Sequence, residues 1–118
     1  MRLRMLKSKL HRATVTDANL EYEGSITIDK KLCDAAQFLE FEQVDIYNCN
    51  NGARFTTYVI YGDNGEICLN GAAARHVHKG DLVIIAAYAD FQVEEAAAYK
   101  PRLVLLDNKN AIKKMDGL

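Results

Sequence analysis

Residues 44–60, VDIYNCNNGARFTTYVI, contain the clearest fold signal in this sequence. The segments Val44–Tyr47 and Arg54–Ile60 are rich in β-branched and aromatic residues, which is typical of β-strands. Between them stands Asn51-Gly52, a dipeptide that tolerates the two positive φ angles of a type I′ turn. We therefore predict an antiparallel hairpin here and expect a mainly β fold around it.

Alternating apolar and polar residues predict further strands on both sides of this hairpin. We expect these strands near residues 5–11, 22–28, 66–69, 82–87 and 103–106, and short helices near 30–39, 71–75 and 93–99. Asp29 stands where a carboxylate would cap the first helix. The tail from Asn108 shows no such pattern, and we expect it to be loosely held.

Six or seven short strands with small helices between them predict a single domain over residues 1–118 and a small closed β-barrel. Side chains fill the interior of a barrel of this size. A functional site is therefore expected on the rim of the barrel or between subunits.

The bulk composition excludes several classes of partner. Lys and Arg number 15 and Asp and Glu 16, so the net charge of −1 gives no basic field for nucleic acid or an anionic membrane. The longest apolar run, Leu82–Ala87, is too short to cross a membrane, and the amino terminus lacks the apolar core of a signal peptide. Cys33, Cys49 and Cys68 are odd in number and widely spaced, as expected for buried, reduced thiols. We therefore expect a cytoplasmic protein with neither nucleic acid nor membrane as a partner.

Two histidines raise the question of a metal site. His76 and His78 are two residues apart and could share one face of a strand, but no third ligand stands at a suitable spacing. We therefore expect a solvated loop there and no metal. His11 is interpreted as a packed polar residue rather than a proton carrier.

The stretch Tyr22–Ile28, YEGSITI, carries a Gly24-Ser25 pair inside a predicted strand. Its ordinary interpretation is a β-bulge, because glycine weakens a strand interior. The alternative is a reactive bond, since glycine leaves its carbonyl approachable and the neighbouring serine supplies a hydroxyl. No G-x-S-x-G elbow surrounds the serine, so a hydrolase triad is not favoured. These residues alone leave both interpretations open.

Two further segments could bind an anion. Arg54 follows the predicted tight turn, and guanidinium is the natural bidentate partner of a carboxylate. The segment Asn70–Ala73 would expose backbone N–H groups at the start of a helical turn, although an ordinary strand-to-helix connection is the equal alternative. Lys9 belongs either to a solvated strand face or to an anion site covered by a neighbouring subunit.

Four segments, taken in order, resemble one family. KLHRATVTDANLEYEGSITID (9–29), NNGARFTTYVIYG (50–62), NGAAAR (70–75) and GDLVIIAAYA (80–89) are similar to the pyruvoyl-dependent aspartate 1-decarboxylases, and the resemblance extends over roughly residues 5–108. It implies a double-psi β-barrel and a homotetramer with active sites between subunits. It also implies decarboxylation of L-aspartate to β-alanine and CO₂, a step that feeds the biosynthesis of pantothenate and coenzyme A.

The resemblance further implies self-cleavage between Gly24 and Ser25. The products are a β chain of residues 1–24 and an α chain of residues 25–118, which begins with a pyruvoyl group made from Ser25. This covalent group replaces pyridoxal phosphate, and no metal is involved. Some relatives need a helper protein for maturation, and the resemblance leaves that partner open here.

Matched motifs give individual residues a role. Ser25 becomes the pyruvoyl group and Tyr58 the proton donor to the decarboxylated substrate. Substrate binding is assigned to Lys9, Arg54, Thr57, Gly71, Ala72 and Ala73. Support of the cleavage is assigned to Gly24, Thr57 and Asn70. Lys9 and Arg54 would hold the two carboxylates of aspartate, without a decision on which takes the α-carboxylate.

The chain departs from the family pattern at Tyr47, in a shorter turn at Gly62–Gly65 and in a brief tail, and two alternatives remain. Tyr47 stands where the family often has tryptophan, which should preserve an aromatic wall. The first alternative is a non-catalytic β-barrel binding module in which Gly24-Ser25 is a bulge. The second is a pyruvoyl enzyme for another amino acid, such as glutamate.

Overall fold

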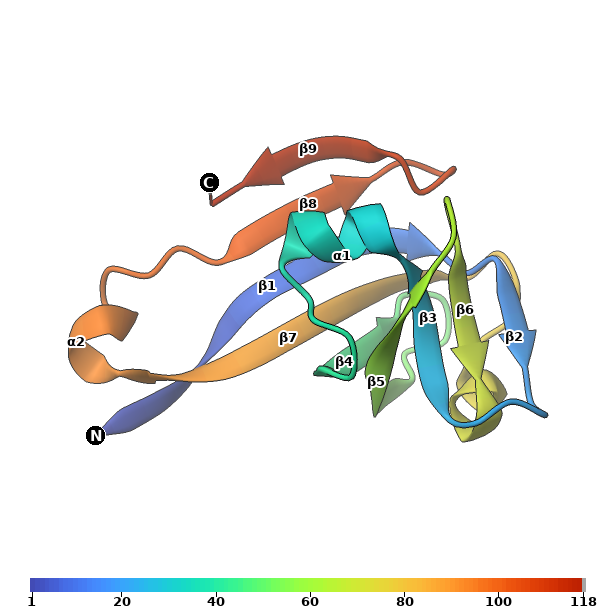
Figure 1. The fold of residues 1–118 in the computed structure, drawn as a ribbon, viewed down its shortest axis with the longest axis horizontal. Helices are drawn as coiled ribbons and strands as arrows, with labels where there is room; N and C mark the ends of the chain where they lie inside the picture. Colours follow the sequence, from blue (N-terminus) through green and yellow to red (C-terminus); the bar gives the residue numbers. More distant parts are fainter. Residues whose placement is uncertain (118) are drawn as a thin grey trace.

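A computed structural model describes residues 1–117 and consists mainly of β-strands (Figure 1). In chain order the strands are β1 (Arg2–Thr14), β2 (Asp17–Asn19), β3 (Ser25–Asp29), β4 (Gln43–Asn48), β5 (Arg54–Gly62), β6 (Ile67–Asn70), β7 (Leu82–Gln92), β8 (Arg102–Leu106) and β9 (Ile112–Asp116). The helices are α1 (Lys30–Ala36), the 3₁₀ helix η1 (Gly71–His76) and α2 (Val93–Ala96). No helix within residues 1–117 is long and apolar enough to span a membrane.

The strands pair in the order β2-β6-β3-β5-β4-β7-β1-β8-β9. Because β1 leads directly into β2, the two ends of the first seven strands meet. Thr16, between β1 and β2, secures this closure: its backbone N–H donates to the Ile67 carbonyl at 2.8 Å, and its hydroxyl accepts from the Ile67 N–H at 3.0 Å. Strands β3 and β5 pair in parallel, as do β2 and β6. The predicted mainly β barrel is therefore confirmed, and its parallel pairs agree with the double-psi type.

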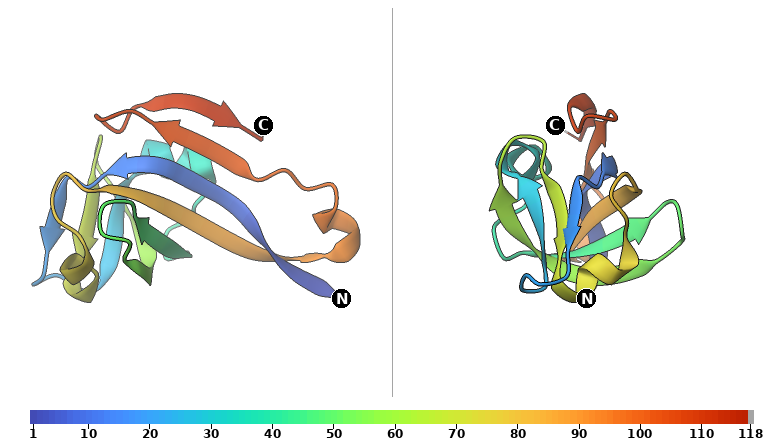
Figure 2. Two further views of the ribbon diagram at one scale, coloured as in Figure 1. Left: turned by 180° about the vertical axis from the view of Figure 1, so that it is seen from behind. Right: turned by 90° about the vertical axis from the view of Figure 1, so that its right-hand side faces the viewer.

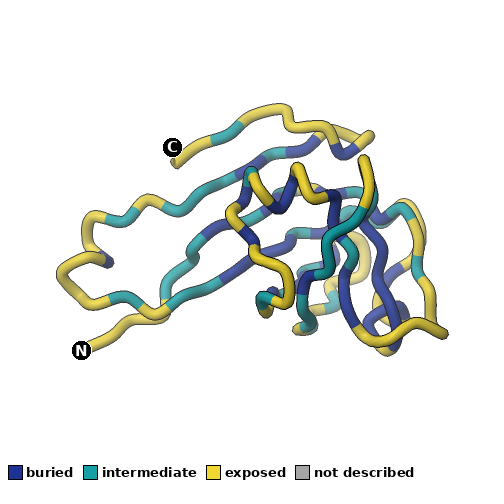
Figure 3. The backbone as a smooth tube through the Cα atoms, viewed as in Figure 1, coloured by how far each residue is buried: buried dark blue, intermediate teal, exposed yellow. Residues whose placement is uncertain are grey.

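The core lies inside this barrel and is made of aliphatic side chains. Ile26, Ile46, Val59, Leu69 and Ile85 are fully buried. Figure 3 shows the buried backbone concentrated in the barrel, whereas the amino-terminal end of β1 and the outer strand β9 are exposed. The core thus stabilises the barrel strands, and the rim of the barrel remains the place for a functional site.

Strands β1 and β7 extend beyond the barrel as a long two-stranded ribbon, with α2 at its far end (Figure 2). Pairing continues from Arg2 opposite Gln92 to Thr14 opposite Leu82, so both strands are longer than the sequence pattern predicts. Helix α2 is shorter than predicted, because it ends at Ala96.

The hairpin of residues 44–60 is confirmed, since Tyr47 pairs with Arg54 in antiparallel β4 and β5. The expected type I′ turn is wrong. Of the two turn residues, only Gly52 has a positive φ, at 77°. The loop spans residues 49–53 instead, and the Asn48 side-chain oxygen accepts the Asn50 N–H at 2.8 Å. This side-chain bond stabilises a wider loop than the Asn-Gly pattern suggests.

The expectation of a loose tail is also wrong. Strand β9 pairs with β8, for example Val104 with Met115, and Met115 packs against the core. Just before β9, the buried Asn110 accepts the Thr14 N–H at 2.7 Å and donates to the Thr14 carbonyl at 2.9 Å. The sequence pattern hides this strand because four of its five residues are exposed, so it lacks the alternation of a half-buried strand.

The connection from β2 to α1 differs in one important respect from the prediction. Strand β3 begins at Ser25, so Gly24 lies in the loop before the strand and is not a bulge within it. Asp29 caps α1 as predicted, accepting the Lys31 N–H at 2.8 Å. The helix stops at Ala36, where Gln37 takes a left-handed conformation. The Gly24–Ser25 bond therefore stands at the boundary between an open loop and a buried strand.

Candidate active site

Gly24 borders a hollow at one end of the barrel. A Cβ placed on Gly24 would meet no atom within 4 Å, so the space beside this residue is open. The hollow has a volume of about 350 Å³ and is lined by Gly24, Phe55, Thr56, Thr57, Tyr58, Ala72, Ala73 and His76. Five of the predicted site residues thus line one cavity, although they come from three separate segments of the chain.

Ser25, the next residue, is buried and held by Asn70. The Asn70 side-chain amide donates to the Ser25 hydroxyl oxygen at 2.9 Å and to the Thr27 hydroxyl at 2.9 Å. The Ser25 hydroxyl donates in turn to the Glu23 carbonyl at 3.3 Å. The Cys68 thiol donates to the Asn70 side-chain oxygen at 3.3 Å, which fixes the orientation of the amide. A buried serine hydroxyl is therefore fixed beside an open glycine.

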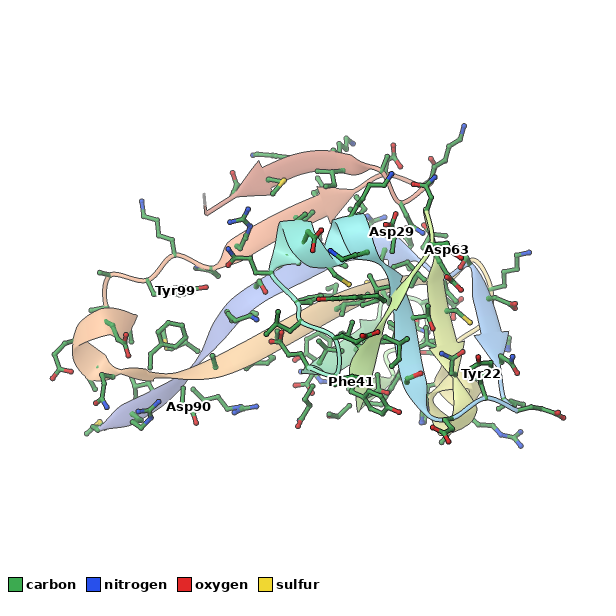
Figure 4. The ribbon with its side chains drawn as sticks, in the orientation of Figure 1. Tyr22, Asp29, Phe41, Asp63, Asp90 and Tyr99 are labelled. Atoms are coloured by element: carbon green, nitrogen blue, oxygen red, sulfur yellow. The ribbon has the colours of Figure 1, made fainter. Side chains whose placement is uncertain are left out.

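Gly71 brings η1 against the loop that carries Gly24. Its φ is +61°, and a Cβ there would lie 2.6 Å from the Gly24 nitrogen and 2.7 Å from the Tyr22 carbonyl oxygen. Tyr22, labelled in Figure 4, lies at the same end of the barrel as η1. Only glycine combines this close approach with a left-handed conformation at low cost. Gly71 thus positions the loop, and Ala72 and Ala73 line the hollow behind it.

Thr57 and Tyr58 reach the hollow from β5, and both are half-buried. The Tyr58 ring lies 6.4 Å from the ring of Phe41, which is an exposed side chain. Both residues therefore line the same cavity as Gly24.

Arg54 stands in an adjoining, smaller hollow. This second hollow is lined by Asp45, Tyr47, Arg54, Phe55 and Thr56, and so shares Phe55 and Thr56 with the first. The Arg54 guanidinium carbon lies 4.0 Å above the centroid of the Tyr47 ring. Arg54 forms no ion pair with a carboxylate of residues 1–117. The cation is close to the candidate site and available to an external anion.

Within a single chain, Lys9 does not line the hollow that Gly24 borders. It lies with His11 in a third hollow, formed against β8 and β9. His11 is half-buried, and burial, followed by the charges of Lys9 and Arg12, lowers its pKa. This agrees with the interpretation of His11 as a packed residue. Lys9 and Gly24 thus line different hollows of the chain.

Sequence reasoning missed Phe55, Thr56 and His76 as lining residues. The rings of Phe55 and His76 stack with centroids 4.8 Å apart and planes inclined by 25°. The His76 carbonyl accepts N–H bonds from the side chains of Asn48 and Asn51, both at 3.1 Å. His76 and His78 are exposed, as expected for a solvated loop, but the stacking of His76 was not foreseen. Its place directly after the NGAAAR segment (70–75) was the only available signal.

The cysteines are free, but the prediction that all three are buried is wrong, because Cys49 is exposed in the β4–β5 loop. Burial, with smaller contributions from Asp34 and Asp29, raises the pKa of Cys33 to about 12. Burial also raises the pKa of Cys68. Within residues 1–117, no three or more His, Cys, Asp or Glu side chains form a group that could hold a metal ion.

Comparisons with known proteins match this chain over nearly its whole length. A family model described as aspartate decarboxylase matches residues 1–113. The chain is 63% identical over 113 residues to a protein of Syntrophomonas wolfei, covering 94% of this chain and 96% of the relative. It is 60% identical over 110 residues to a protein of Campylobacter hominis, with 93% and 96% covered. It is 57% identical over 112 residues to a protein of Bdellovibrio bacteriovorus, with 95% and 90% covered. All three relatives bear the name aspartate 1-decarboxylase.

Proposed function

This chain belongs to the aspartate decarboxylase family, and on that premise we propose how it works. It converts L-aspartate into β-alanine and CO₂, the former a precursor of pantothenate and coenzyme A. The reactive group is a pyruvoyl group that the chain makes from its own Ser25. One observation carries this proposal: a buried serine hydroxyl, held by Asn70, follows a glycine that is open to the hollow of Thr57 and Tyr58.

Maturation begins at the Ser25 hydroxyl. Its oxygen attacks the Gly24 carbonyl carbon, and the amide becomes an ester with a free amine on residue 25. Elimination across Cα–Cβ releases the Gly24 carboxylate, and hydrolysis with loss of ammonia leaves the ketone at the start of residues 25–118. Asn70 holds the attacking oxygen at 2.9 Å, and Thr57, which lines the hollow beside Gly24, polarises the Gly24 carbonyl. The open face of Gly24 admits the geometry that this attack requires.

The chain's own residues then bind and protonate the substrate. The pyruvoyl group supplies an electrophilic ketone that takes the substrate amine and draws electrons from Cα as CO₂ leaves. Tyr58, which lines the hollow, donates a proton to Cα afterwards. Ala72 and Ala73 position the substrate through their backbone, together with Gly71. Arg54 holds one carboxylate from the adjoining hollow.

We assign the second carboxylate to Lys9 of a neighbouring subunit. Within one chain Lys9 lies in a different hollow from Gly24, which supports a site completed by a second copy. A homotetramer with active sites between subunits satisfies this requirement, since closed symmetric assemblies are the usual soluble oligomers. The three free cysteines fit a reducing compartment, and we therefore place the enzyme in the cytoplasm.

Intact mass spectrometry of the purified protein tests the maturation. Two chains are expected, residues 1–24 and residues 25–118, the second with an amino terminus that lacks an amine. A single uncleaved chain after prolonged warm incubation contradicts autonomous maturation. Repeating the incubation in an extract of a source that contains the family's helper protein then separates a helper-dependent precursor from a non-catalytic barrel.

The substrate is tested by measuring CO₂ release from L-aspartate and L-glutamate in parallel. Preference for L-aspartate is expected, because the cations that hold the two carboxylates are placed at a fixed separation by the folded chains. Equal rates with the two amino acids contradict the substrate assignment. Ser25→Ala, which cannot form the ketone, is the matched control and should release no CO₂ from either.

A further inference from the structure

We propose that the hydroxyl–hydroxyl pair of Tyr47 and Tyr88 is a positioning device that fixes Arg54 for binding a substrate carboxylate. This inference rests on the proposed function, in which Arg54 holds one of the two carboxylates. Neither tyrosine lines the Gly24 hollow, and Tyr47 lies under Arg54 in the smaller hollow, so in this inference both act through Arg54.

The first contact in this arrangement joins Arg54 to Tyr47. The two residues are cross-strand neighbours on β5 and β4, and the guanidinium lies 4.0 Å above the phenol ring. Stacking of this kind uses the flat face of the guanidinium. The N–H donors point outward in the plane of the group, where a carboxylate can bind them in bidentate fashion.

The second contact joins Tyr47 to Tyr88. Their hydroxyl oxygens lie 2.7 Å apart, and Tyr88 comes from β7, the strand on the other side of β4. Both rings are half-buried, so the bond limits rotation of the Tyr47 ring. Burial first, and the bond to Tyr88 second, raise the pKa of Tyr47 to about 12. Tyr47 therefore keeps its hydroxyl proton at neutral pH.

The surrounding charges leave the cation free for substrate. Asp45, the carboxylate that lines the same small hollow, accepts the Thr56 hydroxyl at 2.8 Å. Among residues 1–117, no carboxylate forms an ion pair with Arg54. A long, exposed arginine side chain normally loses much rotational freedom when it binds a ligand. Stacking on a fixed ring removes part of that freedom beforehand and so lowers the cost of binding.

Steady-state kinetics of the matured enzyme with L-aspartate test the inference. Tyr88→Phe and Tyr47→Phe each remove the hydroxyl pair but keep both rings. Each should raise KM about three- to tenfold with kcat changed less than about twofold, because the bond affects substrate binding and not the chemical step. The double variant should behave like either single one, since all three lack the same bond. Tyr47→Trp, which keeps a stacking ring and an N–H donor, should restore a KM within about twofold of wild type.

Two further measurements make the result decisive. Tyr99→Phe is the matched control, because it removes a phenol bond of 2.6 Å to the Lys7 carbonyl of β1 while neither residue lines the Gly24 hollow or the Arg54 hollow, and KM should not change. The affinity for succinate, measured by calorimetry, reports on carboxylate binding without turnover and should fall by the same factor as KM rises. An unchanged succinate affinity in Tyr88→Phe overturns the inference, as do additive effects of the two Phe substitutions. If wild type releases no CO₂ from L-aspartate, the proposed function itself fails. That result is distinct from a failure of this inference.

Discussion

Replacing Gly71 with alanine places a methyl group in a close backbone contact of the candidate site. Its Cβ would lie 2.6 Å from the Gly24 nitrogen and 2.7 Å from both the Gly24 Cα and the Tyr22 carbonyl oxygen. All three are backbone atoms, so no flexible side chain can move aside. The loop of residues 22–24 must shift by about 0.8 Å before these contacts reach an ordinary distance of 3.4 Å.

The cost of this substitution has two parts. The left-handed φ of +61° costs alanine about 1–2 kcal/mol, and overpacking adds about 1–3 kcal/mol. The matched control is Gly52→Ala, because Gly52 has a similar φ of +77° but no atom within 4 Å of its Cβ. We therefore expect Gly71→Ala to lose about 2–5 kcal/mol of unfolding free energy, and Gly52→Ala only about 1–2 kcal/mol.

Cleavage should respond more strongly than stability. A misplacement close to 1 Å between reacting atoms costs about 100-fold in rate, so Gly71→Ala should mature about 100-fold more slowly. The rate is followed by intact mass spectrometry during warm incubation. Stability is measured by guanidinium unfolding in a Ser25→Ala background, where every variant stays uncleaved. Maturation of Gly71→Ala at the wild-type rate, with the same unfolding midpoint as Gly52→Ala, would refute the reasoning.

Three other predictions concern single side chains. Tyr58→Phe should mature normally but lower kcat for L-aspartate by about 100-fold, since it lacks the proton donor; a wild-type kcat would exclude this role. Asn70→Ala should slow cleavage about tenfold because the Ser25 hydroxyl loses its amide donor. Asn70→Asp restores the bulk of the side chain without its N–H donor, so its cleavage should be as slow as that of Asn70→Ala. With an alkylating reagent at pH 8, Cys49 should react within minutes, whereas Cys33 should stay unmodified until the protein unfolds. The Cys33 pKa of about 12 leaves almost no thiolate to react. Equal labelling of both cysteines in the folded protein would contradict the burial of Cys33.

Local sequence was sufficient wherever a feature depends on neighbouring residues. The β4–β5 hairpin follows from two strand-forming segments around Asn51-Gly52, and the start of α1 follows from the Asp29 carboxylate. Local sequence pattern was insufficient where contacts beyond the immediate segment determine the backbone conformation. The loop of residues 49–53 widened because the Asn48 side chain competes for its N–H groups, and β9 formed because Asn110 and β8 hold it.

For the candidate site, the sequence indicates which functional groups are present, but it does not indicate how they are arranged in space. The motifs around Ser25, Tyr58 and Asn70 indicate which groups react, because the required functional groups are properties of residue types. Only the folded barrel brings β3, β5 and η1 to one end, since strands distant in sequence pair across the closed sheet. The same folding leaves Lys9 in a separate hollow and joins Tyr47 to Tyr88, and neither fact has a local signal. The sequence thus determined the candidate reactive groups and the strand-rich character of the chain, whereas long-range pairing decided which of those groups meet.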